Sequence, residues 1–129
     1  MTLRVLIVED EMTIAFMVED MLTDLGHEVV EVAMRLPEAL AAARRIEVDF
    51  AILDVNLDGL RSFPVADILA ERGIPFAFAT GYGSAGLDEG YRGRPILAKP
   101  FMHDDLRMLV ARILDDCPPP DSLIPPNAQ

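Results

Sequence analysis

The chain has 129 residues, of which 51% are hydrophobic and 26% are charged, as is typical of one folded domain and not of a disordered protein. The net charge is −11, with 22 acidic and 11 basic residues, so the surface repels nucleic acid and non-specific DNA or RNA binding is not expected. The single cysteine, Cys117, excludes an internal disulfide, and with only two histidines the chain shows no zinc-binding spacing.

The apolar runs of the sequence are short. None approaches the ~20 residues that a membrane-spanning helix needs. The first ten residues also lack the long apolar stretch of a signal peptide. We therefore expect a cytoplasmic protein with no membrane partner.

The first half of the chain alternates twice between strand and helix patterns. Residues 3–8 form a continuous β-branched run, typical of a buried parallel strand. Residues 12–25 have helical periodicity and stop before a glycine, which suits a helix C-terminus. Residues 28–33 predict a second strand. A second helix is expected over residues 37–45, with proline in its first turn.

The same alternation continues with a third and a fourth strand. Residues 49–54 predict the third strand, and residues 58–59, Asp-Gly, predict a turn. A helix capped by Ser62 should follow and end near Gly73. Residues 75–79 predict the fourth strand.

The last part of the chain is rich in glycine and proline. Residues 81–93 hold five of the eight glycines, so any helix there should be weak or missing and the segment mobile. A short fifth strand over residues 94–98 and an amphipathic helix over residues 102–116 should complete one domain, residues 1–117. Residues 118–129 hold five of the ten prolines and predict a disordered tail.

Strands that alternate with helices predict an α/β fold, a doubly wound five-stranded parallel sheet. Ligands of such folds bind beyond the carboxyl ends of the strands. The first strand runs into Glu9 and Asp10, and the third ends at Asp54. The fourth ends at Thr80, and the fifth ends at Lys99, the only lysine of the chain.

The carboxyl ends of parallel strands lie at one edge of the sheet, so these side chains should converge there. Converging carboxylates repel one another unless a cation joins them, and a small site with oxygen ligands suggests Mg²⁺. A lysine beside them can pair with phosphoryl oxygens. Taken alone, each of these residues also has a structural interpretation: the acidic run as a helix N-terminus, Asp54 as a helix or turn cap, Thr80 as a structural residue and Lys99 as a loop residue.

The four sequence motifs at the strand ends resemble those of the receiver domain of two-component response regulators. They are VLIVEDE at residues 5–11, AILDVNLDG at 51–59, AT at 79–80 and KPF at 99–101. The resemblance implies a flavodoxin-like sheet with strand order 2-1-3-4-5. The stretch PFAFATGYG, residues 75–83, resembles more narrowly the "FAT GUY" receivers, which are usually stand-alone regulators.

The resemblance implies a magnesium site and a phospho-acceptor. Asp54 would accept the phosphoryl group. Mg²⁺ would be held by Glu9, Asp10 and Asp54 together with the backbone carbonyl of Asn56. A carboxylate can act as a covalent acceptor, and the charge that develops during transfer then needs a metal and a cation in place.

The resemblance also implies roles for the residues of the last two strand ends. Thr80 would hydrogen-bond the phosphoryl group and change position. Lys99 would pair with that group, and the peptide bond between Lys99 and Pro100 would be cis.

These roles predict a non-enzymatic receiver that accepts phosphoryl from a histidine kinase or a histidine phosphotransfer protein. It would signal to a downstream protein, or act as a phosphate sink, through protein contacts. Three alternatives stay open: a piece of a larger regulator, a metal-dependent aspartyl-phosphate phosphatase, and a degenerate receiver that only binds partners. The phosphatase is disfavoured because phosphatases of the haloacid-dehalogenase type carry a second Asp where this chain has Asn56.

The first predicted helix suggests a docking surface. Its periodicity turns one apolar stripe toward the sheet, consisting of Ile14, Val18, Met21 and Leu25. Phe16 then points away from the sheet with Met12 beside it. An exposed phenylalanine near an acidic site favours a partner that covers it, so we hypothesise that Phe16 and Met12 dock the phosphodonor. A tolerated surface aromatic is the alternative.

The readout of the phosphoryl state should depart from the usual pattern. Receivers commonly carry an aromatic residue three positions before the strand-five lysine, and here that residue is Ile96. Tyr82 follows Thr80 closely and is flanked by glycines that tolerate unusual backbone angles. We hypothesise that Tyr82 is the readout, with a fixed loop anchor as the alternative. His27 and His103 fit no partner pattern and are expected to be solvated.

Overall fold

The computed structural model describes residues 2–57, 59–80, 96–99 and 101–116, with the side chains of the last helix described as far as Ile113. The predictions for residues 81–93, for Tyr82 and for the 118–129 tail therefore lie outside the described residues, as does the peptide bond to Pro100. Within the described ranges, no helix has both the length and the apolar character needed to cross a membrane.

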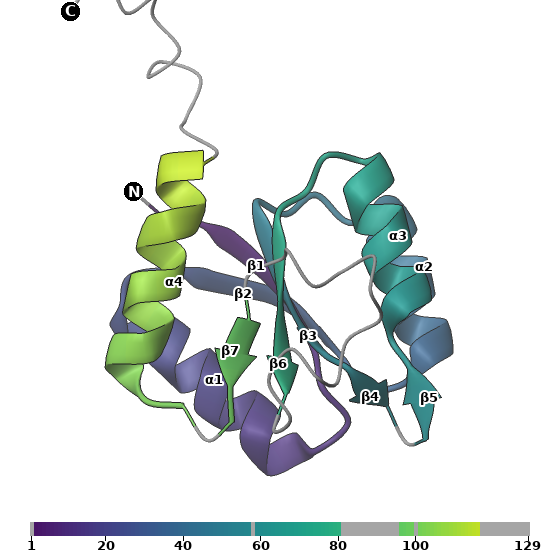
Figure 1. Ribbon diagram of the computed structural model, residues 1–129, viewed down its shortest axis with the longest axis horizontal. Helices are drawn as coiled ribbons and strands as arrows, with labels where there is room; N and C mark the ends of the chain where they lie inside the picture. Colours follow the sequence, from purple (N-terminus) through teal and green to yellow (C-terminus); the bar gives the residue numbers. More distant parts are fainter. Residues whose placement is uncertain (1, 58, 81–95, 100, 117–129) are drawn as a thin grey trace, which may run out of the picture.

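Five strands form one parallel sheet (Figure 1). They are β1 (Arg4–Val8), β2 (Glu28–Ala33), β3 (Phe50–Asp54), β6 (Phe76–Thr80) and β7 (Ile96–Ala98). Their order is β2-β1-β3-β6-β7, and each neighbouring pair is parallel. The predicted doubly wound sheet, with its strand order, is therefore confirmed.

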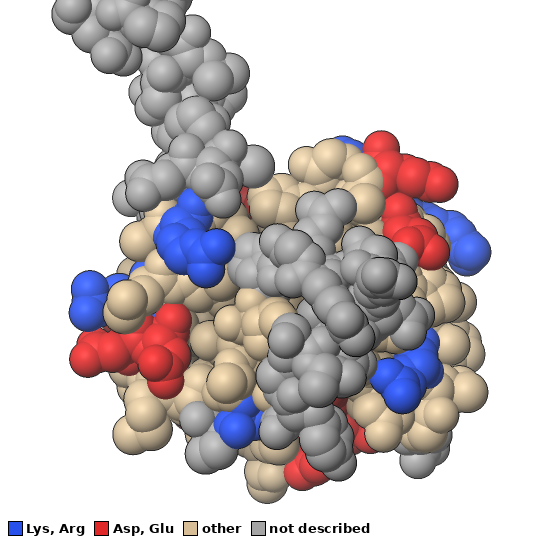
Figure 2. Space-filling model, viewed as in Figure 1, with Lys and Arg blue, Asp and Glu red and all other residues tan. Residues whose placement is uncertain are grey.

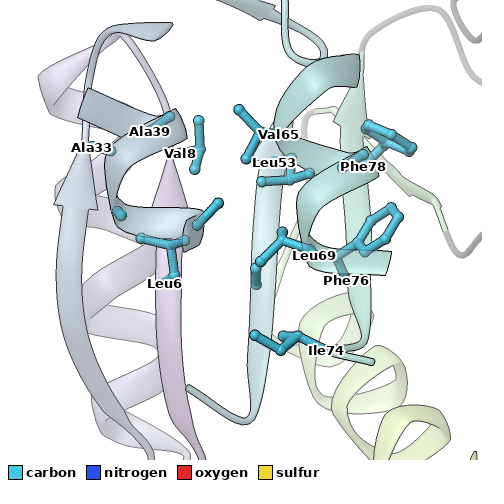
Figure 3. Packing of buried hydrophobic residues seen from close by; sticks show 14 of the residues in the cluster. Leu6, Val8, Ala33, Ala39, Leu53, Val65, Leu69, Ile74, Phe76 and Phe78 are labelled. Atoms are coloured by element: carbon cyan, nitrogen blue, oxygen red, sulfur yellow. The ribbon is translucent and has the colours of Figure 1, made fainter. Parts of the chain in front are cut away.

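Helices cover both faces of the sheet (Figure 1). α1 (Met12–Asp24) and α4 (His103–Asp116) lie on one face, and α2 (Leu36–Arg45) and α3 (Phe63–Glu71) lie on the other. Successive strand residues point to opposite faces, so the strands supply two separate apolar clusters. Figure 3 shows the cluster beneath α2 and α3, with Leu6, Val8, Leu53, Phe76 and Phe78 from the strands.

Helix α1 follows the predicted pattern closely. Val18 and Met21 of the predicted stripe are buried, and Ile14 and Leu25 are half-buried against the same cluster. Gly26 ends the helix with φ +90°, a value that suits glycine. The amides at positions 26 and 27 donate to the carbonyls of residues 23 and 22, which is the Schellman pattern of a helix C-terminus.

A small hairpin follows the third sheet strand and was not predicted as strands. β4 (Asn56–Leu57) pairs antiparallel with β5 (Leu60–Arg61). Two-residue strands are too short to show an alternating pattern, so the sequence revealed only the turn between them. Gly59 has φ +88° in that turn.

Ser62 occupies the predicted N-cap position of α3, but its side chain makes no cap hydrogen bond. Its backbone angles are φ −87° and ψ 5°, whereas a capping residue normally has the extended backbone that directs its oxygen to the first free amides. The prediction that the Ser62 side chain caps the helix is therefore wrong.

Both histidines have partners, and the prediction of a solvated side chain is wrong for His27. His27 is half-buried, and its Nδ1 accepts a hydrogen bond of 3.0 Å from the Leu3 amide. Burial lowers the pKa of His27, so the neutral ring that can accept this bond is favoured. His103 is exposed as expected, but its Nε2 lies 3.1 Å from Asp24 Oδ2 and so links the start of α4 to the end of α1.

Candidate functional site

Three carboxylates meet at the carboxyl edge of the sheet. β1 and β3 are adjacent and in register, with Val8 opposite Leu53, so the residues that follow these positions lie side by side. One carboxylate oxygen from each of Glu9, Asp10 and Asp54 lies within 4.8 Å of the others. Figure 2 shows acidic side chains at the lower edge of the molecule, where the strands of Figure 1 end.

Lys99 brings a positive charge into this cluster. Its Nζ lies 3.0 Å from Glu9 Oε2 and 3.4 Å from Asp54 Oδ2. The Lys99 amide donates a 2.9 Å hydrogen bond to the carbonyl of Thr80, which holds the end of β7 against the end of β6. Thr80 is buried at that point, with 3% of its surface exposed.

Burial and the neighbouring charges shift the pKa values of Glu9 and Lys99. Burial and the neighbouring Asp54 raise the pKa of Glu9 to about 7, although Lys99 acts in the opposite direction. Burial alone would lower the pKa of Lys99, but its hydrogen bond to Glu9 and the charges of both carboxylates raise it overall. Lys99 is therefore the charged partner of carboxylates that one ammonium does not fully neutralise.

Asn56 lies beside Asp54 at the start of the hairpin. Its amide lies 3.5 Å from Asp54 Oδ1, and its Oδ1 accepts a 3.0 Å hydrogen bond from the Gly59 amide. The Asn56 side chain thus stabilises the turn of the hairpin, which begins two residues after Asp54.

The donor set of this cluster fits a small divalent cation. Glu9, Asp10 and Asp54 offer oxygen ligands alone, the kind that Mg²⁺ prefers. Burial first, and the negative charge of Asp54 second, raise the pKa of Glu9, and Lys99 offsets these effects only in part. A cation at this point would relieve that repulsion.

A hollow of about 490 Å³ lies on the β2 side of the cluster. Its lining consists of Asp10, Met12, Val32, Met34, Arg35 and Glu38. The sequence analysis missed Met34 and Arg35 because it considered the ends of the other four strands but not the end of the second one. The rule that led to Asp54 also applies to the residues that follow β2.

The exposed side of α1 carries the two residues predicted for docking. Met12 and Phe16 each expose 54% of their surface, and Met12 also lines the hollow. Ile96, which stands where receivers commonly have an aromatic residue, is half-buried and packs against the cluster that contains Phe78.

Two regulatory proteins are similar to this chain in sequence. The chain is 34% identical over 119 residues to the phyllosphere-induced regulator PhyR of Methylorubrum extorquens, with 88% of this chain and 44% of that protein covered. It is 36% identical over 110 residues to the transcriptional regulatory protein TcrA of Mycobacterium tuberculosis, with 80% and 42% covered. The chain thus spans less than half the length of these two relatives.

Two solved structures are also similar to this chain. SdrG from Sphingomonas melonis Fr1 superposes with a TM-score of 0.78 at 46% identity, covering 86% of this chain and 95% of that one. PhyR from Brucella abortus superposes with a TM-score of 0.77 at 32% identity, covering 90% and 49%. Residues 5–111 match the response regulator receiver domain. The chain therefore belongs to the response regulator receiver family of two-component signalling.

Proposed function

We propose that this receiver accepts a phosphoryl group on Asp54 from the phosphohistidine of a histidine kinase or a phosphotransfer protein in the cytoplasm. An Asp54 oxygen forms the new bond to phosphorus while the P–N bond breaks and its electron pair returns to the imidazole. The observation that carries the proposal is that Asp54 lies both in the three-carboxylate cluster and 3.4 Å from the Lys99 ammonium.

Mg²⁺ is the cofactor we assign to this cluster. Glu9, Asp10 and Asp54 would hold it through their carboxylates, with the backbone carbonyl of Asn56 as a fourth ligand. The ion would neutralise the charge on the oxygens of the transferring phosphoryl group. The oxygen-only donor set supports this choice.

Lys99 and Thr80 contact the phosphoryl group in this proposal. The ammonium of Lys99 already lies beside Asp54 and would form a charge-assisted hydrogen bond to a phosphoryl oxygen. Thr80 ends the neighbouring strand β6, and its hydroxyl would donate to another phosphoryl oxygen after a change of position. Tyr82 would report that change to a partner.

We also propose that the chain acts as a stand-alone receiver of the "FAT GUY" subgroup. The support is that it spans 95% of SdrG at 46% identity. The relatives PhyR and TcrA are each more than twice as long as the part that aligns with this chain. Their length supports the alternative, in which the chain is a receiver within a larger regulator. A solved PhyR from Bartonella quintana is described as an anti-anti-sigma factor, so a protein partner is the output that we favour.

The phosphodonor would dock on the exposed side of α1. Phe16 and Met12 offer apolar surface there, and the hollow beside Met12 can accept a partner side chain. The acidic character of the chain favours a donor with basic residues around its apolar contact.

Phosphorylation with acetyl phosphate and Mg²⁺ tests the assignment. Mass spectrometry should detect one added phosphoryl group in the parent protein and in Asp67→Asn, which removes an exposed carboxylate of α3. Asp54→Asn should remain folded and acquire none. Labelling of Asp54→Asn would refute the proposal, rapid turnover of many phosphate esters would indicate the phosphatase, and no labelling at all would indicate a scaffold.

Beryllofluoride provides a second probe of the same site. One solved structure of SdrG is of its BeF₃-activated conformation. We expect the present chain to bind beryllofluoride only when Mg²⁺ is present and Asp54 is intact.

A further inference from the structure

Ser62 carries a buried hydroxyl that has no hydrogen bond. The residue is 0% exposed, and among the side chains of the described residues its Oγ is the buried polar atom without a partner. Buried polar groups are nearly always paired, because an unpaired group loses its bonds to water and gains nothing in return. A serine in such a place calls for a state of the protein in which the hydroxyl is paired.

Ser62 joins the hairpin to α3 and is tied to the residue next to Asp54. The Ser62 amide donates a 2.9 Å hydrogen bond to the carbonyl of Val55. The hairpin between these two residues begins with Asn56, whose carbonyl is the fourth magnesium ligand of the proposed function. A change at Asp54 or Asn56 therefore reaches Ser62 through one residue and one hydrogen bond.

The α3 side of this joint is firmly held. The Ser62 carbonyl accepts hydrogen bonds from the amides of Val65 and Ala66, at 2.9 and 3.2 Å. Phe63 packs edge-on against Phe78 of β6, with 5.7 Å between ring centroids. These contacts fix the first turn of α3 to the core of the domain.

The hairpin side is held much less firmly. Its two strands have two residues each; Leu57 is its buried anchor in the core, whereas Asn56, Leu60 and Arg61 are exposed. An isolated two-stranded hairpin is marginally stable, and a segment with few buried contacts opens and shifts at low cost. If the backbone near Ser62 moves, we therefore expect the hairpin to shift and α3 to stay in place.

We propose that Ser62 is a positioning residue whose hydroxyl gains a hydrogen bond when strands β4 and β5 adapt to an occupied site. This inference rests on the proposed function, because the occupants are Mg²⁺ and the phosphoryl group on Asp54. The new bond exists in one state only, so it shifts the equilibrium toward the loaded conformation. Ser62 thus stabilises the phosphorylated state without contacting the phosphoryl group.

The test compares the parent protein with Ser62→Ala, Ser62→Thr and a control, Thr23→Ala. Thr23 is exposed on α1, and its hydroxyl bonds the carbonyl of Glu19. Two quantities are measured for each protein: the urea midpoint without Mg²⁺, and the affinity for beryllofluoride at saturating Mg²⁺, followed by NMR titration.

Without Mg²⁺, Ser62→Ala should be at least as stable as the parent, because it removes an unpaired buried group. It should nevertheless bind beryllofluoride about five- to tenfold more weakly, which corresponds to the loss of one net hydrogen bond. Ser62→Thr should restore the affinity, and Thr23→Ala should leave it unchanged. The proposal is overturned if Ser62→Ala keeps the parent affinity, whatever its urea midpoint, or if a stably folded Ser62→Thr binds as weakly as Ser62→Ala. A parent protein that binds no beryllofluoride removes the proposed function and this inference together.

Discussion

The Nζ atom of Lys99 lies 3.0 Å from Oε2 of Glu9, although 90 positions separate the two residues in the chain. Glu9 follows β1, an inner strand, and Lys99 follows β7, the outermost strand on one side, so this ion pair crosses the carboxyl ends of β3 and β6, which lie between them. It leaves Glu9 with two competing partners, the Lys99 ammonium and any cation that enters the cluster.

We expect Mg²⁺ to compete with a proton on Glu9. With a pKa of about 7 in the metal-free protein, much of Glu9 is protonated at pH 6, and a metal ligand must be ionised. The affinity for Mg²⁺ should therefore rise between pH 6 and pH 8, with proton release on binding. Calorimetric titration in two buffers of different ionisation enthalpy measures this release.

Two variants separate Glu9 from the other ligands in that experiment. Glu9→Gln should bind Mg²⁺ more weakly and with much less dependence on pH across this range. Asp10→Asn should also weaken binding but keep the pH dependence of the parent. A Glu9→Gln protein that retains the full dependence would exclude Glu9 as the titrating group.

Glu9 should also make the stability of the metal-free protein depend on pH. Its pKa is about 7 when folded and about 4.5 when unfolded, so the folded state holds more protons between these values. The contribution of Glu9 to the free energy of unfolding is fully present below pH 4.5 and is lost as the pH rises to about 7. Relative to the parent, Glu9→Gln should therefore gain stability as the pH rises from 5 to 8. Urea denaturation of both proteins at several pH values tests this sign, and a relative loss would contradict it.

Arg72 lies outside the site, and we expect it to contribute substantially to the free energy of unfolding. Its Nη1 donates to the carbonyls of Ala43 and Ile46, at 2.7 and 2.8 Å, and so satisfies the C-terminal end of α2 from the end of α3. Arg72→Ala should lower the free energy of unfolding by roughly 1.5–3 kcal/mol, the range for hydrogen bonds to charged groups. The exposed Arg44→Ala should change it by less than about 0.5 kcal/mol. Equal urea midpoints for the two variants would show that the Arg72 contacts contribute little.

The sequence predicted the parts of the fold that repeat over several residues. β2 has the predicted bounds, and α1 begins at the predicted residue, because alternation and helical periodicity extend through these elements. The residues at four strand ends were also identified, since the parallel topology alone brings them to one edge. The β4–β5 hairpin has too few residues for any pattern to appear.

Contacts between residues that are far apart in the chain could not be predicted from the sequence. His27 accepts its hydrogen bond from Leu3, and His103 pairs with Asp24 across 79 positions. Neither pairing leaves a local pattern, because the packing of α1 against its neighbours creates it. The conformation of Ser62 is another such case: serine before a helix predicts a cap, but φ −87° and ψ 5° at Ser62 differ from the extended backbone of a capping residue, and its side chain makes no cap hydrogen bond.

Phe16 should matter for phosphotransfer and not for folding. It exposes 54% of its surface on α1, so Phe16→Ala removes little buried area and should leave the urea midpoint near that of the parent. The rate of phosphotransfer from the cognate donor should fall about tenfold, as for a central apolar contact of an interface. Labelling by acetyl phosphate should not change, because that small donor needs no docking surface.

A matched control for Phe16 lies on another helix. Met108 of α4 exposes 62% of its surface, so Met108→Ala also removes an exposed apolar side chain but from outside α1. Its phosphotransfer rate should equal that of the parent. Equal rates for Phe16→Ala and Met108→Ala would show that the phosphodonor does not dock on Phe16. A Phe16→Ala protein that was slow with both donors would instead point to damage at the acidic cluster, which lies directly before the N-terminus of α1.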